Sequence, residues 1–493
     1  MLIALVLAYV GLTVLIGLIA ARHVKSSKDY LVAGRSLPLY INMATVFATW
    51  FGAETVLSVS AEFAKGGLNA VPADPFGASC ALLFVALFFA KVFYRMDLLT
   101  IGDFYHKRYG KSVEVITSFA IVASYLGWTS AQLTALGLVI AVLSGGSIDL
   151  NTAILIGAGV VVFYTIFGGM WSIALTDLLQ TVVIVIGLLF VAFYVGDLAG
   201  GVGKVIDAAI EADRFSFWPS GDAAEWLAFA AAWMTMALGS IPQQDVFQRV
   251  TSAKDEKTAV RGTLFGAMAY FVFAFVPMFI AYSAIVIDPA SLQLFESEDA
   301  REVQRILPEL ILAKTPLWAQ ALFFGALLSA ILSTASGALL APTALFTENV
   351  LKPLSGKMSD QRMLLLLRVV LILFSLCALM FALNSRSTMY EMVQNAYKVT
   401  LAGALVPLAA GVFWRKATTQ GALLSVFAGL SVWLLSESID PEALIPPQFN
   451  GLFASLMGMI IGSLAPQVIG HQGNHGVVDK AMGSNPQTMR STP

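Results

Sequence analysis

Ionisable and hydroxyl side chains interrupt several long apolar stretches, and Asp177 is the clearest example. It lies in GGMWSIALTDLLQ, residues 168–180, with Thr176 and Gln180 within one turn of it. A carboxylate at the centre of a bilayer costs about 2.5–3.5 kcal/mol, so its presence requires a partner or a function. Asp177 is therefore a candidate for facing a cation path. The alternative is an interfacial aspartate near a helix start, where the helix dipole stabilises negative charge.

Glu54 and Gly52 lie together in a second apolar stretch, MATVFATWFGAETVLSVSAEF, residues 43–63. The density of small residues there predicts a helix that is unwound at its middle. Main-chain carbonyls freed in this way can coordinate a hard cation, as they do in the discontinuous helices of secondary transporters. The alternative is a glycine used for close helix packing, with Glu54 paired to a neighbouring side chain.

Hydroxyl groups cluster in a third stretch, LLSAILSTASGALLAPTALF, residues 327–346. Ser333, Thr334 and Ser336 would offer neutral oxygen atoms, the kind of ligand that suits sodium, beside small residues that permit a close helix approach. Serine and threonine in membrane helices also commonly bond to the carbonyl of residue i−4, and this alternative stays open for the isolated motif.

Asp74 and two tryptophans are candidates for contacting a solute. Asp74 precedes Pro75, so it is either a helix N-cap or a buried functional carboxylate. Trp50 and Trp128 have polar neighbours in otherwise apolar stretches, so they are either core residues or walls of a box for a cationic group.

Residue patterns typical of enzymes are missing from the sequence. All four histidines (His23, His106, His471 and His475) lie outside the apolar runs, and no nucleophile elbow, P-loop or zinc-protease motif occurs. Cys80 and Cys377 both lie inside apolar runs, which supports neither a zinc site nor a structural disulfide. We therefore expect that the protein is not an enzyme.

The elements that must position these residues are membrane-spanning helices. Of the 493 residues, 58% are hydrophobic and only 12% are charged, about half the charged share of a soluble protein. The net charge of −2 also provides no basic field for nucleic acid. Runs long enough to cross a bilayer predict an all-α polytopic membrane protein with about 13 spans. The runs lie near 2–21, 38–64, 74–98, 112–143, 151–168, 172–197, 224–242, 262–287, 316–346, 363–384, 392–414, 418–436 and 450–469.

Basic residues indicate which side of the membrane each loop occupies. Most of them follow odd-numbered runs, which places those loops in the cytoplasm, the N-terminus outside and the C-terminus inside. The basic residues of the first run follow its apolar part, so it is predicted to be an anchor and not a cleaved signal peptide. A bacterial inner or plasma membrane location follows. Examples of the basic residues are Arg22, Arg108, Arg249, Arg368 and Arg415.

Four motifs resemble those of the sodium:solute symporter family. The strongest is GGMWSIALTDLLQ, and the others are ATWFG at 48–52, SIPQQDVFQRVTSAK at 240–254 and SAILSTASG at 329–337. The likeness spans roughly residues 2–465 and extends to bacterial proline and sugar symporters. Several motifs are most similar to the high-affinity choline transporter branch.

This resemblance implies a leucine-transporter-type fold, in which two five-helix inverted repeats are flanked by peripheral helices. A monomer is expected to suffice for transport. The implied division is an N-terminal peripheral helix and basic loop (1–37), the first repeat (38–197), an external loop (198–223), the second repeat (224–414), two peripheral helices (415–469) and a disordered cytoplasmic tail (470–493).

The resemblance also implies a sodium site between the second and ninth spans, with Na⁺ as the co-transported ion. Its five oxygen ligands would be the carbonyls of Ala48, Phe51 and Ala330 and the hydroxyls of Ser333 and Thr334. Asp177, with Thr176, would lie on the ion path as an accessory group.

Positions that approach the central cavity in the family are the expected contacts of the solute. Gln243 stands where a choline cage would have another aromatic ring, which argues against choline itself. The carboxylates would instead neutralise an amine. The candidate residues are Trp50, Glu54, Thr55, Asp74, Trp128, Gln243 and Gln394.

The expected function is sodium-coupled import of a small polar solute by alternating access. The favoured solute is an amino acid such as proline, or a small organic amine. The alternatives are a symporter for a sugar or monocarboxylate, a transporter-like sensor domain and a passive channel.

Overall fold

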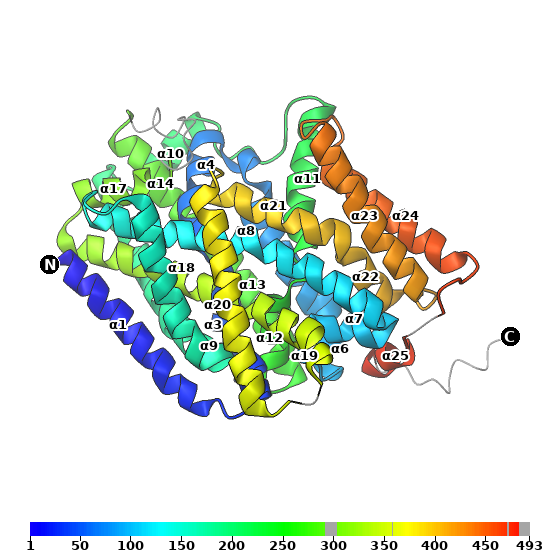
Figure 1. Ribbon diagram of the computed structural model, residues 1–493. Coiled ribbons are helices and arrows are strands. Elements are labelled where there is room, and N and C mark those ends of the chain that lie inside the picture. The colour runs from blue at the N-terminus through cyan, green and yellow to red at the C-terminus, as the bar shows by residue number, and fades with distance from the viewer. Residues whose placement is uncertain (291–302, 357, 471–472, 483–493) are drawn as a thin grey trace.

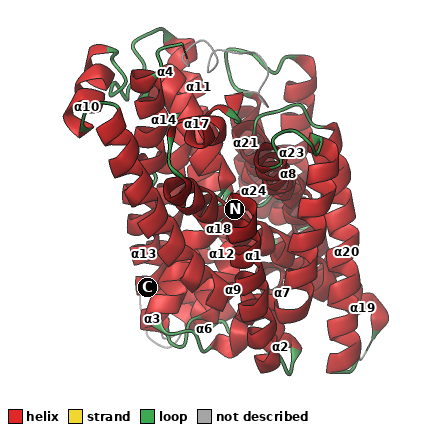
Figure 2. Ribbon diagram, turned by 90° about the vertical axis from the view of Figure 1, so that its left-hand side faces the viewer, coloured by secondary structure: helices red, strands yellow, loops and turns green. Residues whose placement is uncertain are grey.

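The computed structural model describes residues 1–290, 303–356, 358–470 and 473–482. These residues form helices joined by short loops, and the only strand-like pairing among them is an isolated bridge between Leu37 and Ala253. Most of the long helices run in a similar direction, side by side (Figures 1 and 2). An apolar chain in a bilayer favours this arrangement because helices satisfy their own backbone hydrogen bonds.

The first half of the chain contains two broken spans and two long helices. Its helices are α1 (Leu2–Ala20), α2 (Ser27–Val32), α3 (Leu39–Trp50), α4 (Ser60–Gly66), α5 (Ala78–Phe84), α6 (Ala90–Arg95), α7 (Ile101–Tyr109), α8 (Lys111–Leu143) and α9 (Leu150–Leu198). Wide helical turns at Glu54–Val59 and Pro72–Gly77 lie within the broken spans.

The second half contains two bent helix pairs and the most buried helix of the molecule, α18. Its helices are α10 (Val202–Glu211), α11 (Ala223–Gly239), α12 (Gln244–Ser252), α13 (Glu256–Phe273), α14 (Phe275–Ile287), α17 (Ile306–Lys314), α18 (Leu317–Phe346), α19 (Lys352–Ser355), α20 (Asp360–Asn384), α21 (Met389–Gly403), α22 (Leu405–Phe413), α23 (Thr419–Ile439), α24 (Pro447–Leu464) and α25 (Gly476–Met482).

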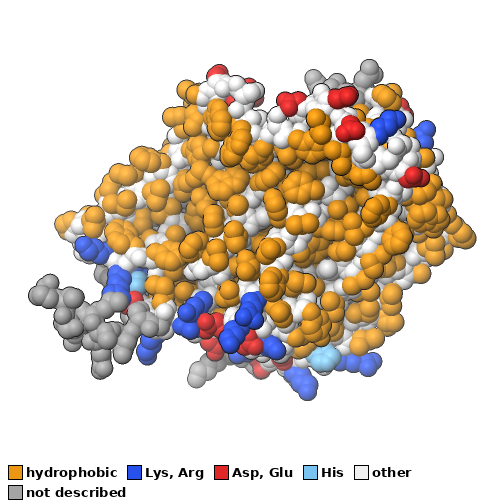
Figure 3. All heavy atoms as spheres, turned by 180° about the vertical axis from the view of Figure 1, so that it is seen from behind, with side chains coloured by type: hydrophobic (Ala, Val, Ile, Leu, Met, Phe, Trp, Pro, Cys, Tyr) orange, Lys and Arg blue, Asp and Glu red, His pale blue; other side chains and the backbone are white. Residues whose placement is uncertain are grey.

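Eight helical segments in the described residues are long and apolar enough to cross a membrane, and two bent pairs raise the number to ten. The predicted count of thirteen stays a prediction. It also includes the broken stretch 38–64, the first part of α9 and α24. On the surface, a wide hydrophobic band separates an edge rich in acidic side chains from an opposite edge rich in basic ones (Figure 3). This is the pattern expected of a protein that spans a bilayer.

Three helix breaks lie near the middle of the spans. Helix α3 ends at Trp50, where Phe51 adopts non-helical angles (φ −83°, ψ 78°). The pair α11–α12 bends by 44° and the pair α21–α22 by 47°. Pro242 lies at the first of these bends and has no amide hydrogen to continue a helix. The break expected near Gly52 therefore occurs, and a second break lies at the bend that contains Pro242.

The paired glycines of GGMW form a kink between two apolar segments of α9. Gly169 has a φ of +49°, a value that favours glycine. A Cβ at this position would also lie 2.4 Å from the carbonyl oxygen of Tyr30. The kink therefore brings α9 against the short helix α2, and it fixes where the segment bearing Asp177 begins.

The core is centred on α18, and the outer helices are lipid-facing. Nearly all of α18 is buried among α9, α8 and α3, whereas little of α1 or α23 is buried. In Figure 1, α1 lies at one edge of the molecule and α23 and α24 lie at the other.

Part of the tail that was expected to be disordered is folded. Helix α25 contacts α6 and α7, and the backbone amide of Asn474 donates to the carbonyl of Lys107 at 3.0 Å. Asp479 of α25 also pairs with Arg415 at 3.0 Å. The expectation therefore fails for residues 473–482, because apolar contacts and an ion pair hold them. Residues 471–472 and 483–493 lie outside the described part.

Candidate ion and substrate site

Four of the five predicted sodium ligands, Ala48, Ala330, Ser333 and Thr334, meet where the broken end of α3 faces α18. The Ser333 hydroxyl donates to the Ala48 carbonyl at 2.6 Å, and the Thr334 hydroxyl donates to the same oxygen at 3.4 Å. Ser333 Oγ also lies 3.0 Å from the Ala330 carbonyl oxygen. Phe51 is the first non-helical residue after α3. All five residues are fully buried.

These oxygen atoms form a donor set that fits sodium. Hard monovalent and divalent cations prefer oxygen ligands. Ser333 and Thr334 reach across to α3, whereas Thr343 of the same helix bonds to its own carbonyl at Leu339, four residues back. Among the described residues, no three His, Cys, Asp or Glu side chains gather to hold a metal ion. The site therefore suits an ion that neutral oxygens can satisfy.

Asp177 is fully buried and lies about two turns beyond the kink at Gly169. Thr45 of α3 donates to its Oδ2 atom. Its Oδ1 atom and both polar atoms of the Gln180 side chain are buried and lack a hydrogen-bond partner within the described chain. Buried polar atoms without partners are costly, so this side of α9 is suited to receive a cation.

Thr176 does not point toward this group. Its hydroxyl bonds to the carbonyls of Ser172 and Ile173 on its own helix, at 2.9 and 3.1 Å. An accessory role for its side chain is not apparent from these contacts, although its position next to Asp177 is as predicted.

Arg249 lies beside the candidate sodium site, although sequence reasoning placed it in a cytoplasmic loop. Its Nε atom donates to the Thr49 hydroxyl at 3.0 Å, and only 2% of the residue is exposed. A Cβ at Gly337, one turn after Ser333, would lie 2.6 Å from Arg249 Nη2. The misplacement arose because the seventh span was ended at residue 242, whereas the chain bends there and continues as α12.

Asp245 is a further buried carboxylate that sequence reasoning missed for the same reason. It lies one turn before Arg249, and Tyr125 of α8 donates its hydroxyl to Asp245 Oδ1. The backbone amide of Asp245 donates back to the Tyr125 oxygen at 2.8 Å. This reciprocal pair joins α8 to α12.

Glu54 is buried and is held by neutral donors from α8. Trp128 Nε1 donates to Oε1 at 3.2 Å, and Gln132 Nε2 donates to Oε2 at 2.6 Å. A Cβ at Gly52 would lie 2.3 Å from the Glu54 carboxylate, so this glycine provides the space that the carboxylate occupies. Glu54 is thus hydrogen-bonded to neutral neighbours, and within the described residues it forms no ion pair with a cationic side chain.

Asp74 is also buried, and its side chain does not cap a helix. Tyr270 donates to Oδ1, and Thr55 donates to Oδ2 at 3.2 Å. The contact with Thr55 joins the third predicted span to the broken second span, and the contact with Tyr270 joins it to α13. Asp74, Thr55 and Tyr270 therefore form one polar group.

Aromatic rings surround this region from four helices, α3, α8, α13 and α21. Trp50 stacks on Tyr397 at 6.5 Å between centroids and 9° between planes, and it meets Tyr270 edge-on at 6.5 Å. Trp128 lies 6.2 Å from Tyr397. The sequence identified the tryptophans by their polar neighbours, whereas Tyr270 and Tyr397 had no such signal.

Gln243 and Gln394 occupy different places. Gln243 lies at the α11–α12 bend, where its Nε2 atom donates to Ser124 at 3.0 Å and to Thr400 at 3.3 Å. Gln394 lies one turn before Tyr397 on α21 and is only partly buried, so it stands at the edge of the group.

Comparisons with known proteins identify the family. The sodium:solute symporter family model matches residues 30–429. The chain is 25% identical over 475 residues to a high-affinity choline transporter of Caenorhabditis elegans, covering 90% of this chain and 78% of that protein. It is 24% identical over 455 residues to a sodium/glucose cotransporter of Vibrio parahaemolyticus, covering 86% and 82%.

A solved structure of a Na⁺-coupled sialic acid symporter in a substrate-bound outward-open state has a similar fold. Its TM-score is 0.80 at 18% identity, covering 94% of this chain and 98% of that one. The likeness confirms the expected all-α, leucine-transporter-type architecture. Together with the match over most of its length, it establishes that the chain belongs to the sodium:solute symporter family, whose members couple solute transport to sodium.

Proposed function

We propose that this symporter imports a small organic amine, or an amino acid recognised through its ammonium group. One observation carries the proposal: Glu54 and Asp74 are buried beside aromatic rings, and the groups that bond to them are neutral donors. A buried carboxyl group is stable as a carboxylate only beside a compensating charge, and otherwise binds a proton. An ammonium group supplies that charge, and ring faces attract it by about 0.5–2 kcal/mol each.

Sodium would enter from outside and bind between α3 and α18. There it replaces the hydrogen bonds by which Ser333 and Thr334 hold the Ala48 carbonyl, and so keeps the two helices in register. The solute then binds beside the breaks of α3 and α11–α12. Without sodium, the binding-competent state would be underpopulated, and this provides the coupling.

The sodium gradient is sufficient to concentrate such a solute. One sodium ion crossing 100 mV releases about 2.3 kcal/mol. A tenfold gradient adds about 1.4 kcal/mol, so a neutral solute can be accumulated about 500-fold. A solute carrying one positive charge is itself driven by the membrane potential.

Counterflow in proteoliposomes tests the proposal. The purified protein is given labelled proline, small amines, choline, glucose and a monocarboxylate, with and without sodium. We expect sodium-dependent exchange of an amine-bearing solute. Exchange of glucose or the monocarboxylate alone would overturn the proposed solute class. Failure of every solute to exchange, together with thermal stabilisation by one of them, would favour a sensor.

A further inference from the structure

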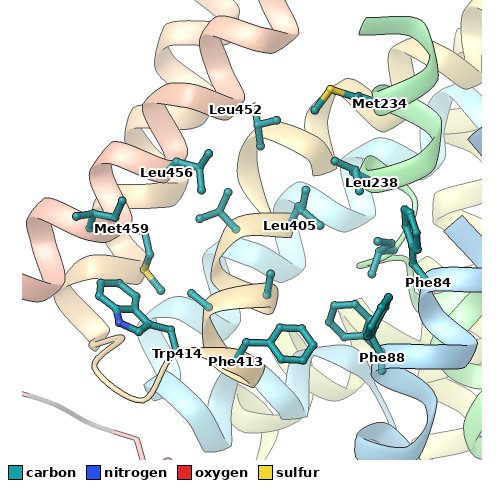
Figure 4. Close-up of a pocket in the computed structure, with 16 residues that line it drawn as sticks. Phe84, Phe88, Met234, Leu238, Leu405, Phe413, Trp414, Leu452, Leu456 and Met459 are labelled. Atoms are coloured by element: carbon teal, nitrogen blue, oxygen red, sulfur yellow. The ribbon is translucent and has the colours of Figure 1, made fainter. Parts of the chain in front are cut away.

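A large apolar groove opens on the side of the molecule away from the candidate ion site. Its volume is about 840 Å³, and all of its lining residues are hydrophobic or aromatic. Figure 4 shows side chains from four elements facing this space. They come from the α5–α6 span, α11, α22 and α24, and include Phe88, Leu238, Leu405, Phe413, Leu456 and Met459.

The groove is about as long as one bilayer leaflet is deep. Along α22 it extends from Leu405, at the helix break, to Trp414 at the cytoplasmic end. The nine residue steps from Leu405 to Trp414 rise by about 13.5 Å at helical spacing. This nearly matches the hydrocarbon of one leaflet, about half of a 30 Å core. Several lining side chains remain about half exposed, including Phe88 at 52% and Phe413 at 54%.

The cytoplasmic mouth of the groove carries the signals of a lipid headgroup region. Trp414 lies there, and tryptophan prefers the membrane–water interface. Lys91 follows the lining residue Phe89 by two positions, and Lys416 follows the lining residue Trp414 by two. The rings of Phe89 and Phe413 meet at 5.5 Å, so the two lysines are attached near the same end of the groove. Both lysines are exposed, and neither forms an ion pair within the described part of the chain.

We propose that this groove binds one anionic phospholipid of the cytoplasmic leaflet. An acyl chain lies along α22 and α24, and the phosphate lies at Lys91 and Lys416. Charge complementarity selects the headgroup, because an exposed lysine near an anionic lipid favours its binding. The match between groove length and leaflet depth selects a lipid chain over a soluble partner.

Binding of this lipid would brace two helix breaks at once. Leu238 and Ile241 flank the α11–α12 bend, and Leu405 and Val406 follow the α21–α22 bend. The opposite sides of these bends carry Gln243 and Thr400, which bond to each other at 3.3 Å. An acyl chain in the groove therefore contacts the joints whose inner sides lie next to the candidate solute site. The binding itself does not depend on which solute is transported.

Native mass spectrometry of the delipidated full chain tests the site. The probes are palmitoyl-oleoyl phosphatidylglycerol and phosphatidylcholine, which differ only in their headgroups. We expect tighter binding of phosphatidylglycerol, and about fivefold weaker binding for each of Lys91→Gln and Lys416→Gln. Lys25→Gln, an exposed cytoplasmic lysine away from the groove, should change nothing.

A second variant tests the groove itself. Ala409→Trp fills the space and should abolish the bound-lipid peak, whereas Ala192→Trp fills a smaller apolar hollow of about 170 Å³ elsewhere and should not. Retention of phosphatidylglycerol by Ala409→Trp would overturn the proposal, as would equal binding of the two lipids in all lysine variants. A dimer that Ala409→Trp disrupts would instead assign the groove to a second copy of the chain.

Hydrogen exchange measures the bracing. Phosphatidylglycerol should slow amide exchange at the two bends in the unmodified protein but not in the Lys91→Gln, Lys416→Gln double variant. These two surface substitutions leave the apolar core intact, so the measurement remains valid if Ala409→Trp does not fold. Unchanged exchange despite lipid binding would contradict the bracing role.

Discussion

The candidate ion site and the candidate solute site lie on the same broken helix but are built from different groups. Around Ala48, the oxygens are neutral and they bond to one another. Around Glu54 and Asp74, the oxygens are carboxylates that tyrosine, tryptophan, threonine and glutamine hold in place. A neutral site can exchange its internal hydrogen bonds for an ion at little cost, whereas buried carboxylates keep a standing demand for positive charge. The difference supports the proposal that sodium controls the helix register and that the carboxylates select the cargo.

The largest effect on transport is expected from removing the hydroxyl groups of both Ser333 and Thr334. Ser333→Ala combined with Thr334→Ala deletes two of the five ion ligands without changing any charge. We expect the sodium concentration for half-maximal uptake to rise about tenfold or more, because two oxygen ligands are lost. Thr343→Ala is the matched control, since its hydroxyl bonds within its own helix. Unchanged sodium dependence in the well-expressed double variant would disprove the assignment.

Neutralising one carboxylate separates cargo recognition from ion binding. Glu54→Gln preserves the shape but removes the charge, so the KM for an amine should rise about tenfold, as expected for one lost ion-pair contact. The sodium dependence should stay near its original value. Glu62→Gln, further along the same span and partly buried, provides the control. Equal losses for cationic and anionic solutes would show that Glu54 has a structural role instead.

A smaller effect on transport is expected from a substitution beside Arg249, the residue that neighbours both sites. Gly337→Ala places a methyl group 2.6 Å from Arg249 Nη2, so the flexible guanidinium must move. If it moves away from the ion site, its repulsion of sodium weakens, and half-maximal uptake should need about threefold less sodium. Uptake kinetics measure this shift. Arg249→Lys, which has a narrower head group, should remove the effect of Gly337→Ala, and persistence of the effect would contradict the steric explanation.

The smallest effect concerns the folded part of the C-terminal tail, residues 473–482. Burial lowers the pKa of His475 below its ordinary value of 6.5, and Arg108 acts in the same direction, while Asp479 opposes the shift. The folded state therefore binds fewer protons than the unfolded tail, and the stability that docking gains from neutral His475 is lost as the pH falls below about 6.5.

Hydrogen exchange across residues 473–482 should consequently speed up on acidification. His475→Gln should remove this pH dependence while sodium affinity stays the same. Exchange that does not change with pH in the unmodified protein would show that His475 does not control docking.

Sequence reasoning located the polar residues that stand out against an apolar background. Asp177, Glu54, Ser333 and Thr334 were visible because ionisable and hydroxyl groups are conspicuous in long apolar runs. Their partners were less visible. Tyr270 and Tyr397 look like ordinary core residues, and only the packing of α13 and α21 brings them to Trp50.

Arg249 and Asp245 show a different reason for failure. They lie in a short polar helix, and hydropathy assigns such a segment to a loop. The bend at Pro242 returns it to the protein interior, where Thr49 and Tyr125 provide partners that are distant in sequence. The folded part of the tail was missed because its contacts with α6 and α7 are likewise long-range. Polar composition alone does not distinguish a solvated segment from a docked one.

The close approach of Gly169 to Tyr30 links the short helix α2 to the position of the buried Asp177 on α9. Because no side chain fits between them, the segment of α9 that carries Asp177 rests directly on α2. Helix α2 is short and begins with a capping box at Ser26, which gives it a defined starting point. The contact of Gly169 with α2 thus sets the position of Asp177 relative to α2, and a shift of α2 would be transmitted along α9 to this carboxylate.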